Sequence, residues 1–254
     1  MSSFNFAEAK DYIVDSFYNP AVFKPLNLLG NQGIGKSSTV FAAAEFLRAL
    51  GLKVRVVDKR LATAEAADFS GIPYNDNGVM RFAKFDWFPS EKLTKDEIKA
   101  VVNRNLATLG INLSSKDKDE YTILFLDEVN RAPRDVQQAV FQLVNDRCLD
   151  DLRLSHRCVI VAAMNDNSEL YQTTRMDPAF LDRFMMMQFK PSDTEWLTYM
   201  DTEVAEGRGH GCVTSFLKSH PTYIDPSNQM IEESTEKNTK TFSRRSWTSL
   251  SAML

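Results

Sequence analysis

The chain has 254 residues, enough to bury a sizeable core, and 43% hydrophobic with 25% charged residues is typical of a globular, soluble protein. A formal net charge of −4 excludes a globally basic nucleic-acid binder, although it is compatible with a local basic groove. The three cysteines lack metal-like spacing, which excludes a disulfide framework and favours a reducing, cytoplasmic setting. No apolar run approaches membrane-spanning length, so we expect no membrane partner.

In the first half of the chain, short apolar runs alternate with helical stretches. The N-terminal segment, "MSSFNFAEAKDYIVDSF", is typical of an amphipathic helix and not of a signal peptide. Strands are predicted at 25–30 and 53–58, with a helix from about residue 36 to residue 50 between them. Residues 72–92 are predicted to form an inserted hairpin that turns at Asn77-Gly78, and 95–110 to form a helix.

The second half continues the alternation with strands predicted at 121–127, 158–165 and 185–190. Helices are predicted at 134–147, where Val136, Val140, Leu143 and Val144 share one face, and at 177–184. Strands with two apolar faces, separated by helices, predict a parallel sheet covered on both sides. The capping-box sequence "SDTE" at 192–195 places a domain boundary near Pro191, which divides the chain into residues 1–190 and 191–254.

A glycine-rich loop, "GNQGIGKS" from Gly30 to Ser37, follows the first of these strands and precedes a helix. The glycines let backbone N–H groups turn toward phosphate oxygens, and the helix adds its positive N-terminal end. Lys36 would then reach the β- and γ-phosphates, and Ser37 would offer its hydroxyl to Mg²⁺. The alternative is a glycine-rich turn that binds no nucleotide.

Two adjacent carboxylates end the apolar run in "TILFLDEVNRAP" (122–133). A bound triphosphate brings Mg²⁺, and a second strand must supply a carboxylate for it. Asp127 suits the metal, through water, and Glu128 can polarise the water that attacks the γ-phosphate. The alternative is a pair of solvated acids at a strand end.

Three further polar residues are candidates for the same reaction. Asn165, at the end of "AAMN", could bond both the γ-phosphate and the attacking water, or could simply form a turn. Arg183 in "FLDRF" and Arg245 in "FSRRSW" could offset transition-state charge, or could form surface salt bridges. Arg131 and Arg175 are weaker candidates, for contacts between subunits.

The stretch "MRFAKFDWF" (80–88) combines aromatic and basic residues. Such a stretch could stack on the bases of a single-stranded nucleic acid, whereas aromatic clusters more often belong to a core. The three histidines are scattered along the chain, which argues against a histidine metal site.

Taken in this order, these motifs resemble the AAA+ ATPases and, within them, the MoxR-like branch. The resemblance covers roughly residues 25–190 and 241–251 and includes "AEAADFSGIP" (64–73), "DEVNRAP" and "SRRSW". It implies a three-layer P-loop NTPase (ASCE/AAA+) α/β core over residues 1–190, with 72–92 as a pore-lining hairpin, and a short helical lid over 191–254. The pattern departs from the branch at Asp166 and Arg244, where proline is common.

The resemblance also implies roles for single residues and a quaternary structure. Asp127 and Glu128 would be the Walker B pair, Asn165 sensor 1, Arg183 an arginine finger acting on a neighbouring subunit, and Arg245 sensor 2. The implied ligands are ATP and Mg²⁺, with the nucleotide held by the Walker A residues Gly30, Asn31, Gln32, Gly33, Ile34, Gly35, Lys36, Ser37 and Ser38. The family usually forms hexameric rings with nucleotide at subunit interfaces, and MoxR-like proteins often work with a von Willebrand A-type partner.

Four functions remain open from the sequence. The first is an oligomeric ATPase that remodels or activates a protein client, and the second is the ATPase subunit of a nucleic-acid motor of the replication or restriction type. A small-molecule kinase would use the same phosphate loop but would need neither Asn165 nor an arginine from a neighbour. A nucleotide-gated scaffold with little turnover is the fourth.

Overall fold

The computed structural model describes residues 3–18, 23–83, 87–89, 120–149, 152–165, 176–224 and 242–254. The helix predicted at 95–110 and the candidate Arg175 lie outside them. Most other predicted elements appear within a few residues of their expected bounds. The chain also contains short elements that its sequence did not indicate, including β1 and the small β7–β8 pair.

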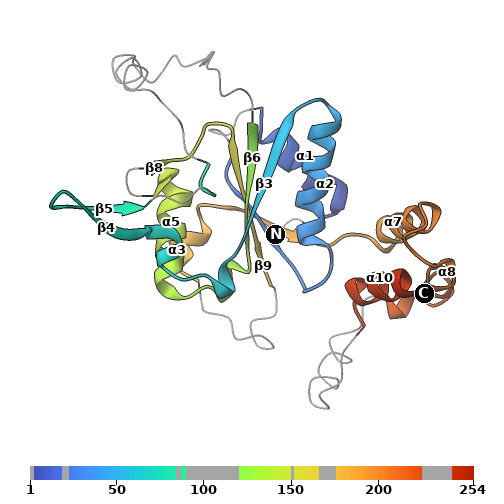
Figure 1. The fold of residues 1–254 in the computed structure, drawn as a ribbon. Helices are drawn as coiled ribbons and strands as arrows, with labels where there is room; N and C mark the ends of the chain where they lie inside the picture. The colour runs from blue at the N-terminus through green and yellow to red at the C-terminus, as the bar shows by residue number, and fades with distance from the viewer. Residues whose placement is uncertain are drawn as a thin grey trace.

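Six strands form one sheet in the order β1-β10-β2-β9-β6-β3, and every neighbouring pair is parallel (Figure 1). This confirms the predicted parallel sheet. Because all strands run the same way, their carboxyl ends share one edge of the sheet. The strands are β1 Ser3–Phe4, β2 Leu26–Leu29, β3 Lys53–Arg60, β6 Glu120–Asp127, β9 Cys158–Met164 and β10 Met185–Phe189.

Helices cover both faces of the sheet, as Figure 1 shows. Helices α1 (Phe6–Asp15) and α2 (Lys36–Ala49) enclose a core on one face together with Ile123 and Phe125 of β6. Helices α3 (Ala67–Ser70), α5 (Arg134–Asp146) and α6 (Pro178–Leu181) enclose the other core with Leu124 and Leu126. Alternate residues of β6 therefore face opposite layers, and every residue of the central strand β9 is buried.

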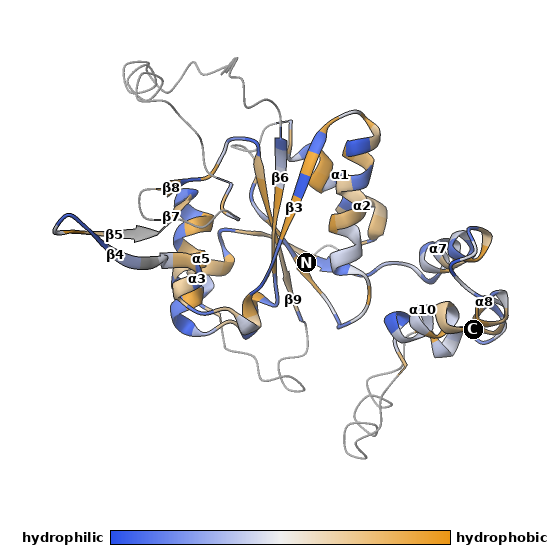
Figure 2. Ribbon diagram, viewed as in Figure 1, coloured by the Kyte–Doolittle hydropathy of each residue, from blue (hydrophilic) through white to orange (hydrophobic). Residues whose placement is uncertain are grey.

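Hydropathy explains why these segments take these positions. Figure 2 shows the apolar residues concentrated on the central strands and on the sheet-facing sides of the helices. Helix α5 buries the four predicted residues, Val136, Val140, Leu143 and Val144, which recur at helical spacing. Helix α1 begins at a capping box between Asn5 and Glu8, which satisfies two N-terminal N–H groups.

A two-stranded hairpin projects from the body of the molecule (Figure 1). Strands β4 (Ile72–Asp76) and β5 (Val79–Ala83) pair in antiparallel fashion, as predicted. The turn between them is Asn77-Gly78, with φ of 52° and 86°, the two positive values that a tight hairpin turn needs. Farther along, β7 (Cys148–Leu149) and β8 (Leu152–Arg153) form a second, very short hairpin.

The aromatic residues that follow the hairpin belong to the core. Phe88 is buried, and the ring of Trp87 lies edge-on to the rings of Phe88 and Phe69. Lys59 of β3 places its Nζ 4.2 Å from the centre of the Trp87 ring, a cation–π contact. Of the two predictions for this stretch, stacking on nucleic-acid bases or packing in the protein core, Trp87 and Phe88 follow the second.

The C-terminal helices enclose a small core of their own. Helices α7 (Asp193–Ala205), α8 (Gly211–Ser219) and α10 (Arg244–Met253) lie together at the right of Figure 1, apart from the sheet. The 3₁₀ turn η4 (Pro221–Tyr223) follows α8 in the chain. Their shared core consists of Met200, Val213, Leu217, Ile224 and Trp247. Helix α7 begins at the predicted capping box, in which the Ser192 hydroxyl accepts from the Glu195 N–H. Within the described ranges, no helix is long and apolar enough to span a bilayer.

Arg244 joins the first and last of these helices. Its side chain is only 4% exposed, and its Nη2 donates to Asp193 Oδ1 at 2.9 Å. The guanidinium group also lies 5.8 Å from the centre of the Trp196 ring. Arg244 therefore holds α10 against the N-terminus of α7.

We expect Arg244→Ala to destabilise the C-terminal helices by about 1–2 kcal/mol, because the side chain loses both packing and a partly buried ion pair. The matched control is Arg245→Ala, an exposed position one residue on, which should stay within about 0.5 kcal/mol of the parent chain. Denaturant unfolding of both variants measures the difference. Equal stability of the two variants would show that the Arg244 contacts contribute nothing.

Candidate nucleotide-binding site

The sheet order brings three of the predicted motifs to one place. The glycine-rich loop follows β2, Asp127 and Glu128 end β6, and Asn165 follows β9, which lies between β2 and β6. Register places Leu29 beside Met164 and Leu126 beside Ala162, so the three strand ends are level. The carboxyl edge of the sheet is where ligands bind in open α/β folds.

The glycine-rich loop has a backbone that only glycine permits at two positions. A Cβ atom built on Gly30 would lie 2.9 Å from the Phe189 carbonyl oxygen, too close for any side chain. Gly35 has φ of 104° and is the N-cap of α2 without a side-chain cap hydrogen bond. The first N–H groups of this 14-residue helix therefore receive no side-chain cap, and a phosphate group can accept from them.

Lys36 connects this loop to the end of β9. Its side chain is buried, and its Nζ donates to the carbonyl oxygens of Gly30 at 2.6 Å and Asn31 at 2.8 Å. A third hydrogen bond, at 3.1 Å, goes to Oδ1 of Asn165. The ammonium group thus donates to neutral oxygen atoms, and a phosphate oxygen could replace one of them.

The carboxylate of Asp127 lies in an environment that disfavours its own charge. Burial raises its pKa, and the negative charges of Glu128 and Asp58 raise it further. The Glu128 N–H, 2.9 Å from Asp127 Oδ1, and the charge of Lys36 act in the opposite direction. Asp58, near the end of β3, also has a raised pKa because of burial, and its sequence pattern had not marked it as part of the site.

These features fit a hard cation with few protein ligands. A divalent ion beside Asp127 would offset the excess negative charge there, and the partly buried Ser37 hydroxyl lies in the first turn of α2. Among the described residues, no three His, Cys, Asp or Glu side chains converge into a metal cluster. The carboxylate of Asp127 and the hydroxyl of Ser37 are oxygen ligands of the kind that Mg²⁺ takes, and Mg²⁺ keeps several waters and takes its remaining ligands from a phosphorylated substrate.

Glu128 adopts an uncommon backbone conformation. Its φ of 57° is left-handed, and this turn sends the chain into the 3₁₀ segment η3 (Val129–Arg131). Its carboxylate accepts a hydrogen bond from Arg131 Nη1 at 3.2 Å. A positive φ in a residue other than glycine costs free energy and often marks a functional turn. The structure thus pairs Arg131, a weaker candidate for contacts between subunits, with Glu128 of its own chain.

Asn165 is buried at the end of β9, and a second asparagine holds its main chain. Asn130 Nδ2 donates to the Asn165 carbonyl oxygen at 2.9 Å, and the Asn165 N–H donates to Asn130 Oδ1 at 3.4 Å. Asn130 lies in the motif "DEVNRAP", but its sequence pattern had assigned it no role in the site.

The two candidate arginines occupy different edges of the sheet. A Cβ atom built on Gly33 would lie 3.5 Å from Arg245 Cβ and 3.3 Å from Ser243 Oγ, so the start of α10 lies against the glycine-rich loop. Arg183 precedes β10 and therefore lies at the amino edge, opposite the loop. Both side chains are exposed, and neither has an ion pair with the described part of its own chain.

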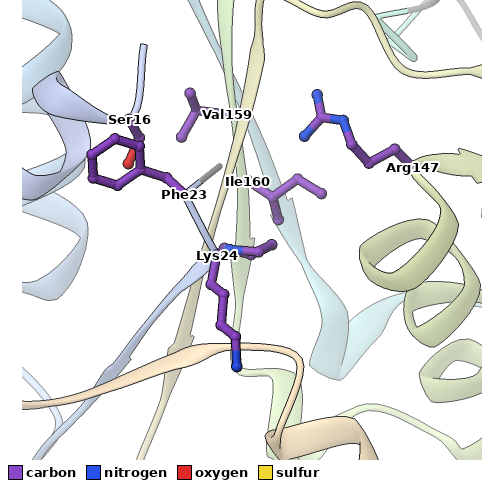
Figure 3. Close-up of a pocket in the computed structure, with 7 residues that line it drawn as sticks. Ser16, Phe23, Lys24, Arg147, Val159 and Ile160 are labelled. Atoms are coloured by element: carbon purple, nitrogen blue, oxygen red, sulfur yellow. The ribbon is translucent and has the colours of Figure 1, made fainter. Parts of the chain in front are cut away.

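The amino edge contains a small cavity of a different kind, drawn in Figure 3. It holds about 10 Å³, room for at most one water molecule, and is lined by Ser16, Phe23, Lys24, Pro25, Arg147, Val159 and Ile160. Lys24 Nζ donates to the Asp182 carbonyl oxygen at 3.1 Å, next to Arg183. This cavity cannot admit a nucleotide, so the candidate site remains the carboxyl edge.

Comparisons with known proteins identify the family of this chain. Residues 25–184 match the family model described as the AAA domain of the dynein-related subfamily. No curated protein matches the chain in sequence. Similar solved structures include the RuvB Holliday junction branch migration motor of Thermotoga maritima, with 12% identity, a TM-score of 0.44, and coverage of 80% of this chain and 50% of that chain.

Two other similar structures are ORC2 of Aeropyrum pernix and PCH-2 of C. elegans. ORC2 has 16% identity, a TM-score of 0.44, and coverage of 77% of this chain and 50% of that chain. PCH-2 has 16% identity, a TM-score of 0.41, and coverage of 79% and 46%. The chain thus spans about half the length of these proteins, and the likeness concerns the fold alone. Because the family model matches well over half of the chain, the chain belongs to the AAA domain family, dynein-related subfamily.

Proposed function

We propose that the chain is a Mg²⁺-dependent ATPase of MoxR type that works as an oligomer, with each nucleotide between two subunits. The observation that carries this proposal is the junction at Lys36, where the loop, the end of β9 and the neighbouring Asp127 meet in one buried, charged site. The overall reaction transfers the γ-phosphoryl group of ATP to water and yields ADP and phosphate.

In this proposal each described side chain has one task. The loop N–H groups, residues 30–38, hold the phosphates, and Lys36 exchanges a carbonyl partner for a phosphate oxygen. When bound, Mg²⁺ offsets charge on the phosphate oxygens, with Ser37 and Asp127 as its protein ligands. Glu128 accepts a proton from the attacking water, and Asn165 orients that water.

The positions of the arginines support an oligomer. Arg245 lies beside the loop of its own chain, where a guanidinium can approach the phosphates. Arg183 is exposed at the far edge of the sheet, from which it cannot reach the nucleotide of its own chain. A neighbouring subunit whose amino edge faces this carboxyl edge would bring its own Arg183 to the γ-phosphate. A ring, usually a hexamer in related proteins, satisfies this requirement for every subunit.

The projecting hairpin supports a protein client more than a nucleic acid. Its exposed large side chains include Tyr74, Val79 and Met80, which are suited to apolar contacts. Trp87 and Phe88, which could have stacked on bases, pack in the core instead. We therefore place a nucleic-acid motor second. A von Willebrand A-type partner and a lid over 191–254 complete the proposal.

Glu128→Gln should keep ATP binding and lower turnover by about 10²–10³-fold, because the amide cannot accept the proton of water. Lys36→Ala should instead weaken ATP binding itself, because the loop loses its buried cation. Steady-state phosphate release and nucleotide titration distinguish the two effects. Unchanged turnover in Glu128→Gln would remove Glu128 from the reaction.

Arg183→Ala should lower turnover by about 10³-fold while leaving nucleotide binding nearly intact. Mixing Arg183→Ala with Glu128→Gln should restore part of the lost activity, because some interfaces then receive a normal Glu128 from one chain and a normal Arg183 from the other. The control is Arg153→Ala, an exposed arginine on β8. No recovery on mixing, with both variants folded and assembled, would contradict action between subunits.

Asp127→Asn should raise the thermal midpoint of the nucleotide-free protein by about 2 °C at neutral pH. The raised pKa of Asp127 means that its neutral form is favoured by the fold, so this stability is present at low pH and is lost as pH rises through the folded pKa. The difference between variant and parent should therefore disappear toward acidic pH. Asp11→Asn, at an exposed position, is the control, and an equal or lower midpoint in Asp127→Asn would contradict the electrostatic account.

A further inference from the structure

The side chain of Asn130 makes two hydrogen bonds to the main chain of Asn165, and the proposed function assigns Asn130 no role. The residue is 5% exposed, and its side-chain amide exchanges two hydrogen bonds with the peptide groups of Asn165, which lies 35 residues away. A buried primary amide is stable only when its donor and acceptor both find partners. Asn130 meets that condition through Asn165.

The Asn130 side chain takes the place of strand main chain beside Asn165. Strands β6 and β9 pair through Leu126 and Ala162, and then the left-handed Glu128 turns the chain away. The peptide groups of Asn165 therefore have no β6 main chain beside them. The side-chain amide of Asn130 presents an N–H and a carbonyl oxygen side by side, as a strand would, and so extends the ladder beyond its last main-chain pair.

The chain of contacts continues into the site. With its main chain held by Asn130, Asn165 directs Oδ1 to Lys36 Nζ at 3.1 Å. On the other side, the Gly30 N–H donates to the Met164 carbonyl oxygen at 3.3 Å. The end of β9 is thus fixed both from the glycine-rich loop and from the turn that contains Glu128.

We propose that Asn130 is a positioning residue for ATP hydrolysis, which fixes the main chain of Asn165 so that its side-chain amide meets the γ-phosphate and the attacking water. The inference rests on the proposed function. Glu128 and Asn130 belong to one short turn whose Val129 is fully buried. The same turn therefore fixes the position of the Glu128 carboxylate, which accepts the proton, and through Asn130 that of the Asn165 amide, which orients the water. A displacement of about 1 Å at such a site can cost about 10²-fold in rate.

The test compares Asn130→Leu with Gln137→Met. Gln137 Nε2 donates to the Ala132 carbonyl oxygen at 2.9 Å, so the control loses a similar amide-to-backbone hydrogen bond outside the site. Asn130→Leu should lower kcat by about 10–100-fold with KM for ATP changed less than about threefold. Gln137→Met should keep kcat. The double variant Asn130→Leu/Asn165→Ala should be no slower than Asn165→Ala, because both changes remove one function.

Asn130→Asp provides a second readout that folding alone would not change. Its carboxyl is isosteric with the amide but lacks a donor when ionised, and it regains an O–H donor when protonated. Its turnover relative to the parent chain should therefore rise as pH falls from about 8 to about 6, since burial favours the neutral acid. A flat pH ratio, additive losses in the double variant, or an equal loss in Gln137→Met would each overturn the inference.

The same experiment separates this inference from the proposed function. A parent chain that releases no phosphate at any protein concentration overturns the proposed ATPase. The positioning role of Asn130 is then tested by nucleotide binding alone. The quantity compared is the ratio of each variant's dissociation constants for ADP and for a non-hydrolysable ATP analogue. Loss of the preference for the ATP analogue in Asn130→Leu but not in Gln137→Met supports the positioning role, and an unchanged preference overturns it.

Discussion

The buried ammonium group of Lys36 is the contact around which the carboxyl edge of the sheet is arranged. It lies within hydrogen-bond distance of two loop carbonyl oxygens and of the Asn165 side chain, and its charge acts on Asp127. A buried cation of this kind requires many acceptors, and a loop of glycines can turn its carbonyl groups toward it. Burial and the negative charges of Glu128 and Asp58 disfavour the ionised form of Asp127, and the charge of Lys36 only partly offsets these effects. A divalent cation beside Asp127 would offset this excess of negative charge next to the glycine-rich loop.

The turn after β6 is the second constraint. The left-handed φ of Glu128 ends the strand abruptly, and the 3₁₀ segment that follows places one residue in the core and the next against Asn165. Because Val129 is fully buried, the turn has little freedom to move. Arg131 then lies on the outer side of the turn, where it pairs with Glu128. A short segment therefore combines packing, charge pairing and a hydrogen-bonded extension of the sheet.

The site is asymmetric in a way that bears on assembly. Its loop, acids, asparagine and Arg245 gather at the carboxyl edge, whereas Arg183 is exposed at the amino edge. The C-terminal helices contribute Arg245 because α10 rests on Gly33, and Arg244 fixes α10 to α7 through Asp193. Two adjacent arginines thus differ completely in environment, one buried and structural, the other exposed beside the loop. The physical origin of the difference is the helix, which turns successive side chains to different directions.

The sequence by itself determined most of the helices and strands and suggested most residues of the candidate site. Alternating apolar runs and helical spacing predicted the parallel sheet and the α5 face, because each depends on local periodicity. The turn at Asn77-Gly78, which needs positive φ, predicted a hairpin over 72–92, and the strands of the hairpin occupy 72–83. The glycine-rich loop and the carboxylates of β6 were identified for the same reason, since their chemistry requires a fixed local spacing. Only the tertiary structure decided which motifs meet. The roles of Asn130, Asp58 and Arg244, and the separation of Arg183 from the loop, depend on the order of strands in the sheet and on contacts between distant segments, which no local pattern encodes.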